Sequence, residues 1–127
     1  MMHNVELAKG VYSVAAVDWT MRNFHGYETP RGITYNAYLI VDEKICLIDT
    51  VKAPFGKELL ERISQIVDPG KIDYIVCNHT EPDHSSALPM IMEKVPNAKV
   101  ILTAQGKESI IKHYQKEYDF QVVKEGD

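Results

Sequence analysis

The chain has 127 residues, a length that allows one compact domain and is too short for two ordinary ones. It is 45% hydrophobic and 25% charged, which excludes a disordered tail, and no apolar run approaches the roughly 20 residues of a membrane-spanning helix. The net charge of −4 argues against a nucleic-acid or anionic-membrane partner, because both need a positive field. Cys46 and Cys77 lie in separate apolar stretches, and we expect reduced core thiols and a cytoplasmic protein.

The apolar spacing in the first half of the chain predicts strands followed by a helix. Three apolar runs are typical of buried strands and lie at 11–17, 34–41 and 45–49. From 52 to 67 the apolar residues recur three or four positions apart, with charged residues on the other face, which predicts a helix. Asp68-Pro69-Gly70 is expected to end it. A long connection at 18–32 has no clear period, and loops of that length are usually functional or mobile.

The second half alternates strands with helices. Strands are predicted at 72–77, 99–102 and 120–123. Between them we expect one helix capped by Ser85 or Ser86 and a second capped by Thr103. This order implies an α/β sheet with crossover helices. The last four residues resemble a hairpin turn whose second strand is missing, which suggests that the chain stops inside a larger domain.

Four potential metal ligands occur within six positions, directly after the predicted strand 72–77: His79, Glu81, Asp83 and His84. Loops at the carboxyl ends of strands are where α/β sheets place their sites. In an extended segment alternate side chains point the same way, so the first three could converge on one side, with His84 turned away unless the chain bends. Two ligands on each of two neighbouring metals would be a natural arrangement. The alternative is a capped turn without metal, but burying so many polar groups needs a compensating partner.

The pattern His79-x-Glu81-x-Asp83-His84 after a hydrophobic strand resembles the metal motif of the metallo-β-lactamase-like superfamily. Most members of that superfamily are zinc hydrolases with a histidine where this chain has Glu81. The glutamate, together with the segments 24–32 and 79–85, resembles the flavodiiron proteins (A-type flavoproteins, rubredoxin:oxygen oxidoreductase-like). This resemblance covers essentially the whole chain. It implies an α/β, metallo-β-lactamase-like αββα sandwich, of which residues 1–127 form only the N-terminal half.

The resemblance also implies a set of site residues. His79 and Glu81 would bind one iron of a non-haem di-iron centre, and Asp83 and His84 would bind the other. A carboxylate in place of an imidazole makes the site harder and more anionic, which suits iron better than zinc. His25 would act catalytically from the pocket above the centre, with a structural loop histidine as the alternative. Asp49, at the end of a predicted strand, is expected either to hydrogen-bond a metal ligand or to orient the loop.

The family's remaining ligands and its flavodoxin-like FMN domain would lie beyond residue 127, so FMN is expected only in the full-length protein. The implied activity is reduction of dioxygen to water, of nitric oxide to nitrous oxide, or of both. Electrons would arrive through FMN from rubredoxin or a similar donor, and the protein would be a homodimer or would need a complementing C-terminal half. Two alternatives stay open: a zinc-dependent hydrolase of the same fold, and a catalytically incomplete fragment that pairs with another chain.

Overall fold

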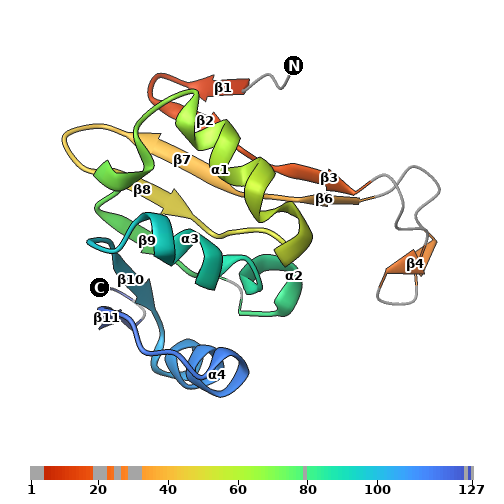
Figure 1. The fold of residues 1–127 in the computed structure, drawn as a ribbon, viewed down its shortest axis with the longest axis vertical. Coiled ribbons are helices and arrows are strands. Elements are labelled where there is room, and N and C mark those ends of the chain that lie inside the picture. The colour runs from red at the N-terminus through yellow and green to blue at the C-terminus, as the bar shows by residue number, and fades with distance from the viewer. Residues whose placement is uncertain are drawn as a thin grey trace.

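The computed structural model describes residues 5–18, 23–24, 27–28, 33–78, 80–124 and 126. Its main feature is a seven-stranded mixed sheet in the order β1-β2-β7-β8-β9-β10-β11 (Figure 1). The strands are β1 (Val5–Ala8), β2 (Val11–Ser13), β7 (Tyr38–Val41), β8 (Ile45–Ile48), β9 (Tyr74–Val76), β10 (Lys99–Leu102) and β11 (Phe120–Val122). From β1 to β8 the neighbours are antiparallel, and from β8 to β11 they are parallel. The α/β sheet expected from the sequence is confirmed.

Helices connect the parallel strands, as crossover connections require. They are η1 (Ala53–Phe55), α1 (Gly56–Ser64), η2 (Pro69–Lys71), α2 (Pro82–Ser85), α3 (Leu88–Lys94) and α4 (Ala104–Tyr114). In Figure 1, α1 and α3 lie in front of the sheet. With eleven residues α4 is the longest helix in the described ranges, and none of those helices has the length and apolar character needed to cross a membrane.

The core lies between the helices and one face of the sheet. Register aligns Leu39, Leu47, Ile75 and Val100 across four neighbouring strands, and all four are fully buried. The helices contribute buried side chains of their own: Leu59 and Ile63 from α1, Leu88 and Ile91 from α3, and Ile110 from α4. This buried row accounts for every second residue of the apolar runs in the sequence, since successive side chains of a strand point to opposite faces of the sheet.

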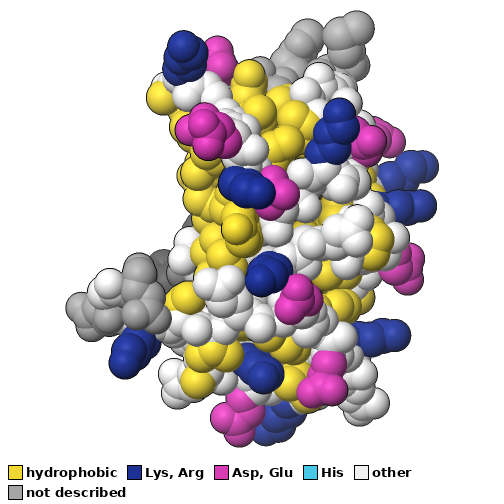
Figure 2. Space-filling view, turned by 90° about the vertical axis from the view of Figure 1, so that its left-hand side faces the viewer, with side chains coloured by type: hydrophobic (Ala, Val, Ile, Leu, Met, Phe, Trp, Pro, Cys, Tyr) yellow, Lys and Arg dark blue, Asp and Glu magenta, His cyan; other side chains and the backbone are white. Residues whose placement is uncertain are grey.

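The opposite face of the sheet is also apolar but less buried. The register forms a second row there, in which Tyr38, Ile48, Val76 and Ile101 are half-buried. Val5, at the β1 edge of this row, is 57% exposed. Figure 2 shows a band of hydrophobic side chains between dispersed acidic and basic ones on the side of the molecule that it presents. Exposed apolar area of this kind is typical of a surface that another element covers.

Two predicted strands are each divided in the structure. The run 11–17 becomes β2 and β3 (Ala16–Asp18), and the run 34–41 becomes β6 (Ile33–Tyr35) and β7. The breaks coincide, since the Val14 N–H donates to the Ala37 carbonyl at 2.9 Å. Beyond them β3 pairs with β6 as a separate two-stranded ribbon. The connection 18–32 carries a further short hairpin, β4 (Asn23–Phe24) with β5 (Tyr27–Glu28).

The expected helix cap at Ser85 or Ser86 is wrong. The helix α3 begins after Ala87, which provides no side-chain cap. Ser86 Oγ instead accepts a 2.7 Å hydrogen bond from the Ala53 N–H, and Ser85 lies in the separate short helix α2. The Thr103 cap is confirmed, because its hydroxyl accepts from the Gly106 N–H at 3.0 Å.

Candidate metal site

The segment 77–86 leaves the sheet at the carboxyl end of β9, where the parallel neighbours β8 and β10 also end. Side chains that follow three adjacent strands therefore meet at one edge, which is the usual position of a site in such a sheet. The backbone N–H of Cys77 donates to the Ile101 carbonyl on β10 at 2.8 Å. The start of the segment is thus fixed to its neighbouring strand.

Asp49 fixes the segment from the β8 side. The residue is 6% exposed, and its Oδ1 accepts a 2.8 Å hydrogen bond from the Asn78 N–H. Its own N–H donates to the Val76 carbonyl at 2.7 Å. The backbone of Asp49 has φ of 62°, a left-handed conformation that non-glycine residues rarely adopt. The expectation that Asp49 orients this loop is confirmed by these contacts.

The segment does not stay extended through Asp83. Pro82–Ser85 forms the short helix α2, and the His84 N–H donates to the Glu81 carbonyl at 2.9 Å. Thr50 holds the turn, because its N–H and its hydroxyl both donate to the His84 carbonyl, at 3.2 and 2.8 Å. The alternation argument for Asp83 therefore fails. Helical geometry governs instead, and it places positions three apart, such as 81 and 84, close along one side of the turn.

The predicted ligands differ in how far the structure describes them. Glu81 is exposed and His84 is half-buried. Asp83 lies in α2, but its side chain is outside the described residues, as are the whole of His79 and His25. Within the described part of the chain, which leaves out those groups, no three His, Cys, Asp or Glu side chains are close enough to hold a metal. The two carboxylates and two imidazoles of this segment nonetheless fit iron by their chemistry, and Glu81 and His84 are joined by one closed turn.

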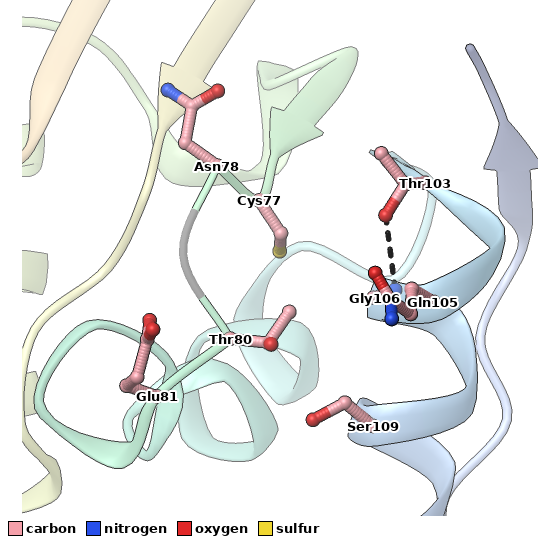
Figure 3. A pocket seen from close by; sticks show the side chains of 8 residues that line it. All are labelled: Cys77, Asn78, Thr80, Glu81, Thr103, Gln105, Gly106 and Ser109. Carbon is pink, nitrogen blue, oxygen red and sulfur yellow. Dashed lines mark hydrogen bonds between the residues drawn. The ribbon is translucent and has the colours of Figure 1, made fainter.

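A cavity of about 350 Å³ opens between this segment and the N-terminus of α4. Figure 3 shows Thr80 and Glu81 on one side of it and Gln105 and Ser109 of α4 on the other. The Cys77 sulfur also lies at its wall. Burial, with the Asp49 charge as a second cause, raises the pKa of the Cys77 thiol to about 12. The thiol therefore stays protonated at neutral pH, as a core residue would.

The sequence contained an unused signal for α2. Proline is favoured at the first position of a helix, where its missing N–H needs no partner, and Pro82 occupies that position. Two contributors to this turn were not recognised in that role: Thr50, which binds the His84 carbonyl, and Ser85, which was expected to cap a helix but whose hydroxyl binds backbone carbonyls of the same segment. No local pattern identifies Thr50, because its partner lies 34 positions further along the chain. The Ser85 contacts reach only four and five positions back, and serine in a helical turn is known to bind the carbonyl four positions before it.

Comparison with known families defines the class of protein. The family model described as ODP family beta lactamase matches residues 33–127, and the chain belongs to this family. The fold class inferred from the motif is thereby confirmed: a metallo-β-lactamase-like α/β domain, present here as its N-terminal half.

Individual relatives narrow the assignment. A nitric oxide reductase of Moorella thermoacetica is 49% identical over 129 residues, which cover 99% of this chain and 32% of that protein. The structure of rubredoxin oxygen:oxidoreductase from Desulfovibrio gigas superposes with a TM-score of 0.92 at 43% identity, covering 98% of this chain and 32% of that one. The flavodiiron protein of Giardia intestinalis follows with 0.91 at 39% identity, covering 98% and 31%. The chain therefore matches the N-terminal metallo-β-lactamase-like part of a flavodiiron protein and spans about a third of the length of these relatives.

Proposed function

We propose that this chain contributes to a flavodiiron oxidoreductase that reduces dioxygen to water, nitric oxide to nitrous oxide, or both. The observation that carries the proposal is the combination of Glu81 in the metal motif with relatives, similar over nearly the whole chain, that are named for these two reductions. A di-iron centre, if bound here, would supply the redox chemistry needed to reduce a diatomic substrate. The residues of this chain hold the irons and set the environment of the substrate.

The ligand assignment is part of the proposal. His79 and Glu81 hold one iron, and Asp83 and His84 hold the other. Support comes from the backbone of the segment, which hydrogen bonds at Cys77, Asn78 and His84 fix to two neighbouring parts of the fold: β10, and the residues that directly follow β8. A backbone held at these three positions needs little further ordering there when a metal binds. His25 acts as the proton or hydrogen-bond donor to the substrate, because histidine side chains in general can donate or accept a proton near neutral pH.

The rest of the apparatus is proposed to lie outside residues 1–127, which would form a partial di-iron domain. The further ligands and a flavodoxin-like FMN domain would come from additional sequence, and rubredoxin or a similar protein would deliver the electrons. The half-buried row Tyr38, Ile48, Val76 and Ile101 supports a complementing C-terminal half, because an apolar sheet face of this extent is stabilised by a second layer. A homodimeric assembly and a cytoplasmic setting, where the free thiols Cys46 and Cys77 would stay reduced, complete the proposal.

The test is metal and activity analysis of the polypeptide that carries this chain, expressed with the sequence that follows Asp127 in its gene. After anaerobic reconstitution with ferrous ion we expect two irons per chain, and oxygen or nitric oxide consumption with reduced rubredoxin. Glu81→Ala should lose iron and activity, whereas the control Glu93→Ala, an exposed residue on α3, should lose neither. Stoichiometric zinc together with esterase or thioesterase activity would contradict this function and would identify a zinc-dependent hydrolase of the same fold. Failure to bind either metal would leave a non-catalytic, complementing piece.

A further inference from the structure

Ser85 links the candidate metal segment to the far end of α4. The side chain is 1% exposed, and its Oγ lies 2.8 Å from the Thr80 carbonyl oxygen and 3.0 Å from the Glu81 carbonyl oxygen. A third partner, the hydroxyl of Tyr114, lies 2.7 Å away. Tyr114 is the last residue of α4 and stands 29 positions further along the chain.

The chemistry of the partners sets the direction of these hydrogen bonds. Carbonyl oxygens only accept, so the single hydroxyl hydrogen of Ser85 points toward Thr80 and Glu81. Because that hydrogen is engaged, we assign the Tyr114 hydroxyl as the donor to Ser85 Oγ, in a contact where either oxygen is able to donate. Burial raises the pKa of Tyr114 above its ordinary value, and the phenol therefore keeps this proton throughout the neutral range. Consecutive hydrogen bonds thus lead from the Tyr114 hydroxyl to Ser85 and from Ser85 to the two carbonyls.

The other end of α4 touches the same segment. A Cβ added to Gly106, in the first turn, would lie 3.3 Å from Cγ2 of Thr80, so the helix backbone packs closely against that side chain. The helix itself is anchored by buried Ile110 and by the Thr103 cap. Thr80 is thus held by α4 at its side chain and, through Ser85 and Tyr114, at its carbonyl.

We propose that Tyr114 is a positioning residue of the metal site, which acts through Ser85 to fix the backbone from which Glu81 projects. This inference rests on the proposed function, because it assumes that the segment binds metal. The backbone carbonyls on both sides of the Glu81 N–H–Cα unit are held by one hydroxyl, so the direction of the Glu81 side chain depends on that hydroxyl staying in place. Groups that orient a ligand typically alter metal affinity tenfold to a hundredfold when removed.

The experiment compares two hydroxyl deletions in the polypeptide that carries this chain, expressed with the sequence that follows Asp127 in its gene. Tyr114→Phe removes the donor to Ser85. Tyr118→Phe is the matched control, because Tyr118 is also half-buried but makes a ring contact with Phe120 at 5.9 Å instead. Ferrous-ion affinity is measured anaerobically by competition with a chromogenic chelator, and the unfolding of the metal-free forms is followed in urea. We expect Tyr114→Phe to bind ferrous ion about tenfold more weakly and the control to bind it like the wild type.

A double-mutant cycle with Ser85→Ala separates positioning from general stability. The two changes should be non-additive in metal affinity, since either one breaks the same link. If Tyr114→Phe lowers only the urea midpoint and leaves ferrous-ion affinity unchanged, Tyr114 is structural and the inference is wrong. If the wild type itself binds no iron, the proposed function fails instead, so the two failures are distinguishable.

Discussion

Asp49 and Asn78 are joined by a 2.8 Å hydrogen bond between a nearly buried carboxylate and a backbone N–H, across 29 positions of sequence. Asp49 makes this contact from a left-handed backbone with φ of 62°. Such a conformation costs on the order of 1 kcal/mol for a residue with a Cβ, and it persists only where surrounding contacts favour it. The strain therefore coincides with the point where the candidate metal segment leaves the sheet.

Substitutions of Asp49 should separate the contribution of its hydrogen bond to Asn78 from the cost of its left-handed backbone. Asp49→Ala leaves the Asn78 N–H without its acceptor and should lower the free energy of unfolding by about 1–3 kcal/mol. Asp49→Asn keeps an acceptor oxygen and tolerates the left-handed backbone, so a smaller loss is expected. Urea denaturation measures both. The control is Asp42→Ala, which removes an exposed carboxylate that accepts from the Glu43 N–H. Equal losses at positions 42 and 49 would contradict the anchoring role.

The Thr50 hydroxyl offers a second test of how the turn is held. Thr50→Val keeps the shape of the side chain but removes the donor to the His84 carbonyl, a contact of 2.8 Å at a residue that is 1% exposed. We expect a loss of about 1 kcal/mol, because the Thr50 N–H still serves that carbonyl. Thr34→Val, at an exposed position, should change stability by less than about 0.5 kcal/mol. Thermal or urea denaturation of the two variants measures both stability losses. Equal losses would contradict the role of the Thr50 hydroxyl in holding the turn.

The cap of α4 is testable by itself. Thr103→Ala deletes the oxygen that accepts from the Gly106 N–H and should cost about 1 kcal/mol of stability. Thr103→Ser retains the oxygen and should recover most of this loss. Hydrogen exchange of the amides in the first turn of α4 should speed up in the alanine variant and remain slow in the serine variant. Unchanged exchange in both would exclude a capping role.

The buried thiol of Cys77 predicts that the stability of the folded chain depends on pH in the alkaline range. Burial raises the folded-state pKa of Cys77 from 9.0 to about 12, so the unfolded chain loses this proton first as the pH rises. The contribution of Cys77 is therefore fully present below about pH 9, and stability falls between about pH 9 and 12. Cys77→Ala should flatten this part of the stability profile relative to wild type. Iodoacetamide at pH 8 should label Cys77 slowly in the folded chain and readily in urea, as mass spectrometry can measure.

Sequence reasoning succeeded where a residue's role follows from its local pattern. The apolar run around Leu47 and the periodicity of Leu59 and Ile63 report burial directly, and both were placed correctly. It failed where the partner lies far along the chain. Serine is a residue type that often caps helices, yet the Ser85 hydroxyl binds Tyr114. Only the packing of α4 brings Tyr114 close to Ser85. The short strand β1 was missed because its four residues are all exposed.

The change from antiparallel to parallel pairing at β8 has a consequence for the order of assembly. The hairpin β7–β8 closes across three intervening residues. The pairings of β9 with β8 and of β10 with β9 each require closing a longer connection that contains helices. Pairings between distant segments form slowly, because the entropy of closing the loop is lost before any contact compensates for it. We therefore expect the hairpin to appear early in folding and the edge that carries Glu81 and His84 to take shape late, so that an ion added to the nascent chain would meet scattered ligands rather than a site.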